Sequence, residues 1–310
     1  MVTMSCHLVR VATVSVLAIT MLRAQSSEQN DPAQLVKQGR QLASQGKQDE
    51  ALALYRHALQ QSPDSFDALI SIGTLLDLQG KYDEARKNIE KAIQVAPSPA
   101  AKAQAQRTMA ISYAFQQKAV EAAKYEAPLF ASQLAAKDYY AAGETADELA
   151  RIYLESGDLN DAYTWYHKGY EAGLKQPDIT DSRKNVWQFR WENAQARIAA
   201  RRGNRTEAQK RVLAAKDYLD KAADSQQQSF YPYLTGYVAF YGGEYKTAIA
   251  DLRGANQRDP FVLSLLAQAY EKTGDKTQAM ECYRKILTFN MHNPTNAFAR
   301  PLAKQKVQQS

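Results

Sequence analysis

Two stretches of the sequence carry side chains that could bind an anionic ligand. The first, here called the basic strip, is Arg190, Asn193, Arg197 and Arg201. The second, the aromatic strip, is Phe230, Tyr233, Tyr237 and Tyr241. Spacings of three and four residues place the members of each strip on one face of a helix. A guanidinium group pairs with a carboxylate through two parallel hydrogen bonds, and a tyrosine offers a rigid surface with a polar tip. The strips therefore favour an acidic or C-terminal peptide segment as ligand.

The same residues have two other interpretations. Tyrosines can pack between neighbouring helices, and arginines can lie on a solvated face with their aliphatic stems along the helix. Tyrosines can also stack on sugar rings, which would make the chain a glycan-binding or cell-wall-binding module. The sequence leaves these alternatives open.

Motifs for catalysis are missing. The sequence contains no Gly-x-Ser-x-Gly, no Gly-x-Gly-x-x-Gly and no phosphate loop. A catalytic histidine needs an orienting partner, and no local motif supplies one. We therefore expect no enzyme activity. The enzyme alternative is a hydrolase or transferase in the middle of the chain, and it requires four residues to converge: Asp147, Glu148, His167 and Arg190.

Composition argues against several other classes of site. Two cysteines and four histidines, far apart in sequence, are too few for a zinc or iron–sulfur framework. We therefore expect neither a metal nor a cofactor. The 39 basic and 33 acidic residues give a net charge of +6, which is small for this length and is not typical of a nucleic-acid-binding protein. A hydrophobic content of 45% indicates a folded chain.

Residues 1–24 have the plan of a signal peptide. Arg10 precedes an apolar run over residues 11–22, and a small residue, Ala24, ends the segment. As a helix that run would span about 18 Å, short of the roughly 30 Å of a bilayer core. We expect cleavage after Ala24, a flexible tether over residues 25–31, no transmembrane segment in the remainder, and export to the periplasm or the exterior of a bacterium. The alternative is an uncleaved helix that packs on the domain.

A repeat of about 34 residues organises the rest of the chain. Gly46-Lys47-Gln48-Asp49-Glu50-Ala51 recurs as Gly80-Lys81-Tyr82-Asp83-Glu84-Ala85 at an offset of 34. Five further copies follow, each an apolar-periodic stretch, a turn and a second such stretch. Two antiparallel helices per unit are predicted, and the glycine suits a helix end with positive φ.

Each unit has a small residue at one position of both helices. In the first helices these are Gly39, Gly73, Ala110, Ala150, Ala196, Gly236 and Ala267. In the second helices they are Ala51, Ala85, Ala122, Ala162, Ala208, Ala248 and Ala279. Two backbones approach closely only where neither helix carries a bulky side chain, so these positions predict where the helices of each hairpin cross.

This pattern resembles the tetratricopeptide repeat (TPR) over roughly residues 32–293. The first unit carries the large, small and aromatic residues of that repeat in order: Leu35, Gly39, Leu42, Ala51, Tyr55, Ala58 and Pro63. Two units depart from it. The third has Glu126 where an aromatic or aliphatic residue is expected and Leu129 in place of a small one, and the fifth has Gln195 and Ala199 at core-facing positions. The resemblance implies an all-α, right-handed α-solenoid of about seven helical hairpins.

Irregular spacers divide the expected array. Units 1 to 3 fall in residues 32–136 and units 4 to 7 in residues 137–293, with a bend or insertion near residues 176–185. Residues 294–310 are expected to form a capping segment, because the last unit of a solenoid otherwise exposes its apolar face.

The resemblance also implies a function. First helices of such arrays line a concave groove, so the basic and aromatic strips predict a peptide-binding groove in units 5 and 6. The Lys and Asn residues of clamps that bind chaperone C-termini are not reproduced at Val36, Arg40 and Ser71, so that specific ligand is not expected. We expect an exported, non-catalytic scaffold that binds a protein or peptide for cell-envelope assembly. Neither the partner's identity nor an oligomeric state follows from the sequence.

Overall fold

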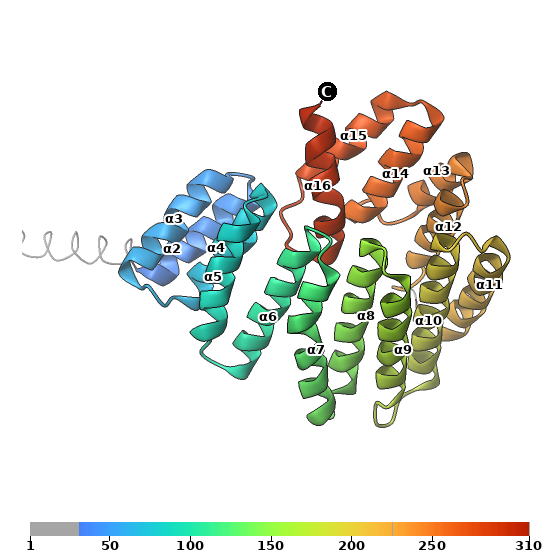
Figure 1. Ribbon diagram of the computed structural model, residues 1–310, viewed down its shortest axis with the longest axis horizontal. Coiled ribbons are helices and arrows are strands. Elements are labelled where there is room, and N and C mark those ends of the chain that lie inside the picture. The colour runs from blue at the N-terminus through green and yellow to red at the C-terminus, as the bar shows by residue number, and fades with distance from the viewer. Residues whose placement is uncertain (1–30, 225, 310) are drawn as a thin grey trace, which may run out of the picture.

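The computed structural model describes residues 31–309 with the exception of residue 225. The predicted signal peptide, residues 1–24, lies outside the described residues. Within the described part the chain forms fifteen α-helices and no strand (Figure 1). None of these helices is both long enough and apolar enough to cross a bilayer.

The helices pair into seven antiparallel hairpins that follow one another along the chain. These are α2 (Pro32–Ser44) with α3 (Gln48–Gln61), α4 (Phe66–Gln79) with α5 (Tyr82–Gln94), α6 (Pro99–Ala114) with α7 (Ala119–Ala135), α8 (Tyr139–Ser156) with α9 (Leu159–Leu174), α10 (Asp181–Arg201) with α11 (Arg205–Ala222), α12 (Phe230–Tyr241) with α13 (Tyr245–Gly254), and α14 (Pro260–Thr273) with α15 (Lys276–Leu287). A last helix, α16 (Pro294–Gln308), follows. The predicted all-α solenoid is confirmed.

Helix ends are set by turn and capping residues. Gly80 ends α4 with φ 82° and Gly157 ends α8 with φ 95°, a region that a residue with a Cβ rarely adopts. At helix starts, Ser65 and Asp138 accept hydrogen bonds from the amides of Ala68 and Ala141, which satisfies donors that have no partner within the helix.

The small residues lie where the helices cross, as predicted. The seven alanines of the second helices are at most 2% exposed. A Cβ at Gly73 would lie 2.5 Å from Cγ1 of Ile89, and a Cβ at Gly236 would lie 2.6 Å from Cγ of Leu252. A larger residue at either glycine would therefore push the two helices of the hairpin apart.

Units 4 and 5 are built from longer helices than unit 1. α10 has 21 residues and α11 has 18, against 13 and 14 in α2 and α3. The insertion expected near residues 176–185 comprises the connection before α10 and the first turn of that helix. Trp187, in the second turn of α10, is 1% exposed and fills space left by Gly143 and Gly173 on α8 and α9. Unit 5 is thus anchored on unit 4 by one indole ring.

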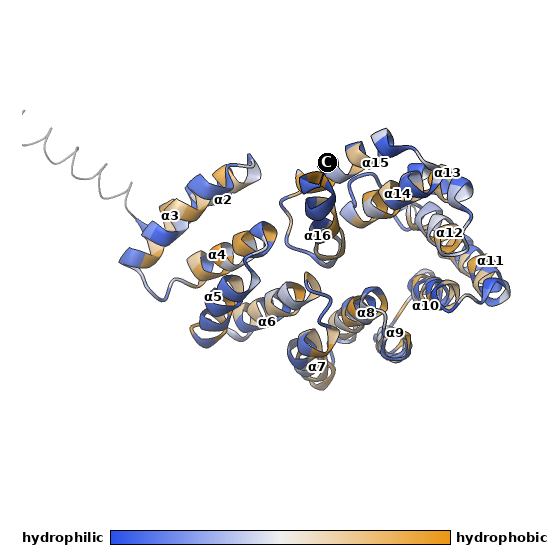
Figure 2. Cartoon of the chain, turned by 45° about the horizontal axis from the view of Figure 1, so that its top comes forward, coloured by the Kyte–Doolittle hydropathy of each residue, from blue (hydrophilic) through white to orange (hydrophobic). Residues whose placement is uncertain are grey.

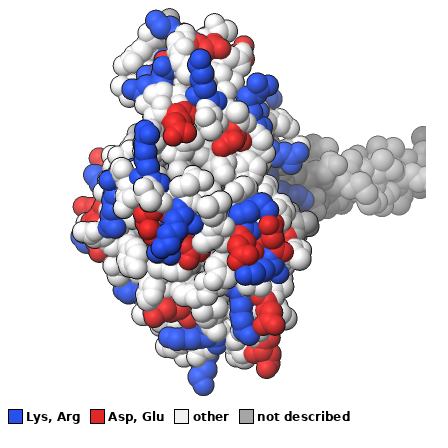
Figure 3. Space-filling view, turned by 90° about the vertical axis from the view of Figure 1, so that its right-hand side faces the viewer, with Lys and Arg blue, Asp and Glu red and all other residues white. Residues whose placement is uncertain are grey.

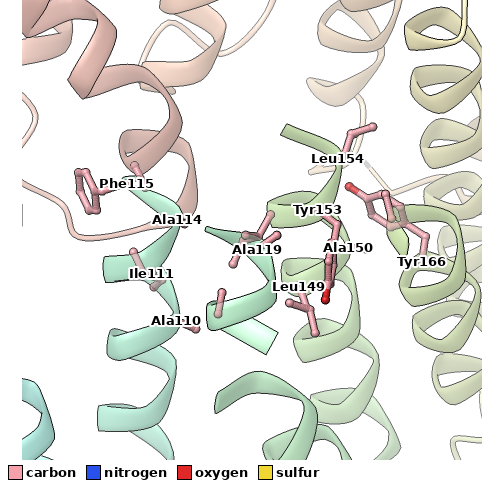
Figure 4. Close-up of a cluster of buried hydrophobic side chains, with 14 of the residues drawn as sticks. Ala110, Ile111, Ala114, Phe115, Ala119, Leu149, Ala150, Tyr153, Leu154 and Tyr166 are labelled. Atoms are coloured by element: carbon pink, nitrogen blue, oxygen red, sulfur yellow. The ribbon is translucent and has the colours of Figure 1, made fainter. Parts of the chain in front are cut away.

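The core runs continuously through the middle units. Figure 4 shows Leu149, Ala150 and Tyr153 on α8, with Ala119 of α7 on one side and Tyr166 of α9 on the other. The same cluster takes in Leu78 from α4 and Ala297 from α16. Residues from both ends of the array therefore share one core.

The hairpins form an arc, and α16 lies on its inner side (Figure 2). This helix covers the apolar face of unit 7, where Ala299 and Ala303 pack against Leu263 and Tyr283. It also packs against α6 and α8. The segment expected only to cap the last unit therefore reaches back to the units near the start of the chain.

Polar contacts fasten this closure to unit 2. Nε of Arg300 donates to the carbonyl oxygen of Leu78 at 2.8 Å, and Nζ of Lys304 donates to that of Gln79 at 2.7 Å. His292 lies with Nε2 2.8 Å from Oδ2 of Asp77, and both side chains are buried. The chain thus closes on itself across the concave side of the arc.

Candidate ligand-binding site

A cavity of about 320 Å³ lies among the first helices of units 4 to 7. One wall comes from α8 and α10, with Tyr166 of α9 behind them. The opposite wall comes from the residues that begin α12, α14 and α16. The closure of the arc by α16 therefore completes the cavity.

Three members of the basic strip line this cavity. Arg190 forms ion pairs with Glu144 and, at 3.8 Å, with Asp147, and its guanidinium lies 4.8 Å from the centroid of the Trp187 ring. Nε of Arg197 donates to Oδ1 of Asn193 at 2.9 Å, and Nη2 donates to the Tyr166 hydroxyl at 3.0 Å. Arg197 and Asn193 are each 7% exposed, so both are fixed elements of the wall.

The fourth basic residue, Arg201, lies beside the cavity. It forms an ion pair with Glu155 at 3.2 Å and donates to the Tyr241 hydroxyl at 2.9 Å. Glu155 also accepts a hydrogen bond from the Tyr237 hydroxyl. This group of buried charges and rings joins α8, α10 and α12.

The aromatic strip divides in the same way. Phe230 and Tyr233 line the cavity, whereas Tyr237 is fully buried between helices and Tyr241 stacks on Arg201. Phe230 is 46% exposed, and Tyr233 is 7% exposed. Five of the eight predicted residues therefore share the cavity, while Arg201, Tyr237 and Tyr241 pack beside it.

Arg151 of α8 is a cavity residue that the sequence reasoning missed. Its guanidinium stacks 5.2 Å from the centroid of the Phe261 ring, and its Nε and Nη2 have no hydrogen-bond partner among the described residues. A signal for it exists in the sequence. Arg151 follows the small residue Ala150 just as Arg197 follows Ala196, so an alignment of units 4 and 5 places both arginines on the same helical face.

Acidic residues share the cavity with these arginines. Burial raises the pKa of Asp147 to about 7, against the lowering effect of Arg190 and Arg197, and Glu144 adds to the rise. Burial likewise raises the pKa of the Tyr166 hydroxyl to about 12. Asp147 therefore changes between its neutral and charged forms near neutral pH.

The enzyme alternative required four residues to converge, and they do not all do so. Asp147, Glu148 and Arg190 line the cavity. His167 lies away from it on α9, with its ring 5.3 Å from that of Trp191 and 6.4 Å from that of Tyr170. In the part of the chain that the structure describes, no cluster of three His, Cys, Asp or Glu residues is arranged to hold a metal ion.

Comparison with known proteins agrees with this architecture. Two family models, each described as a tetratricopeptide repeat, match residues 42–107 and 262–290. The chain is a tetratricopeptide repeat protein. The matched stretches lie at opposite ends of the array, and the irregular units between them fall outside both matches.

Solved structures share the fold of this TPR protein. A tetratricopeptide repeat protein from Parabacteroides merdae has a TM-score of 0.52 at 14% identity, and the match covers 89% of this chain and 97% of that one. The apo form of RapI has a TM-score of 0.57 at 11% identity, over 90% of this chain and 99% of that one. No curated protein sequence matches the chain.

The departure of this TPR protein from its family pattern at Glu126 has a structural counterpart. Glu126 is 1% exposed on α7. Burial raises the pKa of its carboxyl well above the usual value, and the neighbouring Glu148 carboxylate raises it further. Arg107 binds Glu148 with Nε at 2.7 Å and Nη2 at 2.5 Å, so Arg107 neutralises Glu148 directly.

We expect Glu126→Gln to stabilise the protein at pH 8 by about 1 to 3 kcal/mol and to have little effect at pH 4. An acid whose pKa is raised by folding is neutral in both states at low pH, and the native protein loses stability as the pH rises from the unfolded pKa towards the folded one. Gln has no charge to bury. Urea unfolding at several pH values measures the effect, with the exposed Glu90→Gln on α5 as control. Parallel pH profiles for Glu126→Gln and wild type would contradict it.

Proposed function

We propose that this TPR protein is an exported, non-catalytic scaffold that binds a segment of a partner protein at the cavity of units 4 to 7. The observation that carries the proposal is the meeting of the two strips. Arg190, Asn193 and Arg197 come from α10, Phe230 and Tyr233 come from α12, and all five line one hollow.

The chemistry of the hollow suits a peptide. An exposed aromatic ring beside buried, fixed polar groups is typical of protein-binding sites, in which a few aromatic and arginine residues supply most of the binding energy. Phe230 is the exposed ring, and Arg197 and Asn193 are the fixed groups. Charges elsewhere are mixed: Figure 3 shows basic and acidic side chains interspersed over one face of the molecule.

Phe230→Ala is expected to reduce recovery of the partner about tenfold or more, because it removes an exposed ring at the mouth of the cavity. Crosslinking in intact cells, followed by identification of what co-purifies, measures the recovery. Leu213→Ala is the matched control, since Leu213 is 62% exposed on α11 and does not line the cavity. Equal recovery by wild type and both variants would remove this site from the proposal.

Export is proposed from the sequence of residues 1–24. Sequencing the N-terminus of the protein from envelope and extracellular fractions tests it. A mature chain that begins at Gln25 supports cleavage after Ala24, and a chain that begins at Met1 in the cytoplasm contradicts it. We further propose that the exported scaffold serves the assembly of envelope complexes.

Glycan binding is a second candidate with its own observation. Four rings cluster on α9 and α10: those of Tyr163, His167, Tyr170 and Trp191. Tyr163 is 41% exposed, and Tyr170 stacks on Trp191 at 5.8 Å between ring centroids. Exposed rings of this kind can stack on sugars. Sedimentation of the protein with purified wall material, lost in Tyr163→Ala, would favour this function.

A further inference from the structure

Three helices begin at the wall of the cavity. The residues that precede them, Ser229 before α12, Asp259 before α14 and Asn293 before α16, all line it. The first amides of a helix have no partner within the helix, and the aligned peptide dipoles place partial positive charge at this end. Three such ends at one hollow favour an anion.

Two arginines add full charges that no acid neutralises directly. Arg151 has no ion pair within the described residues, and its Nε and Nη2 have no hydrogen-bond partner. Arg197 bonds to neutral partners, Asn193 and Tyr166. The two guanidinium groups lie 5.8 Å and 6.0 Å from the centroid of the Tyr233 ring. The nearby carboxylate of Glu155 is already held by Arg201.

A buried polar group without a partner is unfavourable unless a ligand or a water molecule satisfies it. Tyr233 is a second such group: its hydroxyl lines the same region, has no partner in the described part of the chain, and belongs to a residue only 7% exposed. The cavity therefore holds unsatisfied donors on Arg151 and Tyr233 beside three helix starts.

The arrangement favours a carboxylate over a phosphate. The Nε and Nη2 atoms form one edge of the guanidinium group, and their parallel N–H bonds match the two oxygens of a carboxylate. Glu144, Asp147 and Asp259 also line the cavity. Their negative charge repels a doubly charged phosphate more than a singly charged carboxylate.

We propose that the cavity binds a carboxylate group, held by Arg151 and Arg197 where α12, α14 and α16 begin. This inference rests on the proposed function only in placing the ligand at the same cavity. The carboxylate belongs either to a small free acid or to the peptide segment of a partner. Because Asn293 and Thr295 of the closing segment line the cavity, a bound ligand also fastens α16 to units 4 and 5.

Calorimetric titration with acetate and succinate, with inorganic phosphate in a parallel titration, tests the chemistry on the full mature chain. We expect succinate to bind wild type and Arg253→Gln alike, since Arg253 is exposed on α13. Arg151→Gln should weaken binding about tenfold or more, because the paired donors are lost. Tyr233→Phe removes only one hydroxyl and should weaken binding severalfold. Circular dichroism shows whether each variant is folded.

The pH dependence gives an independent readout. Asp147 faces Glu144 on its own helix, Tyr166 on α9, and Arg190 and Arg197 on α10. Deprotonation of Asp147 adds a negative charge to the cavity, so succinate should bind more weakly at pH 8 than at pH 6. Asp147→Asn should remove this difference. The same pH dependence in Asp147→Asn and wild type would overturn the assignment of the site to this cavity.

Peptide arms identify the source of the carboxylate. A pool of peptides with free C-termini is compared with the same pool amidated. Binding of succinate to wild type and its loss in Arg151→Gln support a free acid. Binding of only the free-carboxylate peptides, lost in Arg151→Gln, supports a peptide. Phosphate binding as tight as succinate binding, or equal binding of every probe by wild type and folded Arg151→Gln, overturns the inference.

The inference and the proposed function fail separately. Partner capture that depends on Phe230 but is unchanged in Arg151→Gln keeps the scaffold function and removes the carboxylate site. Succinate binding that depends on Arg151, with partner capture unaffected by Phe230→Ala, keeps the carboxylate site and removes the proposed partner-binding site.

Discussion

Arg300→Ala is expected to lower the free energy of unfolding by about 2 to 4 kcal/mol. The guanidinium of Arg300 donates to three backbone carbonyls, those of Leu78 at 2.8 Å, Leu287 at 3.1 Å and Phe289 at 2.9 Å. Arg300 is 8% exposed. Alanine leaves these acceptors without their charged donor, and part of the cost of burying them is then uncompensated.

The position of the three carbonyls makes the effect larger than that of an ordinary hydrogen bond. Leu78 lies in α4 of unit 2, whereas Leu287 and Phe289 lie at the end of unit 7. An open solenoid holds only contacts between neighbouring units, but this side chain joins two distant units. Its loss should release α16 from unit 2 as well as destabilise the chain.

Urea unfolding measures the loss of stability, and small-angle X-ray scattering measures the opening of the arc as an increase in radius of gyration. Arg284→Ala is the control, because Arg284 is exposed on α15, and we expect its effect to stay within about 0.5 kcal/mol. If Arg300→Ala unfolds like that control and scatters like wild type, the closure does not depend on Arg300.

The repeat itself could be predicted because its determinants are local and periodic. Ala51 and Ala85 are buried at the crossing points that their offset of 34 residues indicates. Each pair of helices meets within one unit or with the next, so a pattern in sequence corresponds directly to a contact in space. The same reasoning placed five of the eight strip residues in one cavity without the coordinates.

The closure could not be predicted in the same way. His292 and Asp77 are 215 residues apart, and their contact repeats nowhere else in the array. The sequence indicated that residues 294–310 would cover an apolar face, but a pattern of small and large residues does not specify a second face on units 2 to 4. Arg151 was missed for a different reason: the basic strip was sought within one helix, and this arginine lies on the preceding first helix.

Trp187→Ala is expected to lower the free energy of unfolding by about 3 to 5 kcal/mol, because it leaves a cavity the size of an indole ring between α8, α9 and α10. Trp187 is 1% exposed, and its Nε1 has no hydrogen-bond partner among the residues described. The expected cost is therefore one of packing alone. A Cβ at Gly143 would lie 2.5 Å from Cη2 of the same ring, so the surrounding backbone is shaped to the indole.

The loss should also reach the ligand-binding cavity. Arg190 stacks on Trp187 at 4.8 Å while it holds Glu144 and Asp147, so removal of the ring frees Arg190 and alters the cavity wall. Urea unfolding gives the stability, and the succinate titration gives the effect on the site. Trp165→Ala is the matched control: Trp165 is half-buried on α9 and does not line the cavity. Equal losses of stability in the two variants would show that Trp187 does not anchor unit 5 on unit 4.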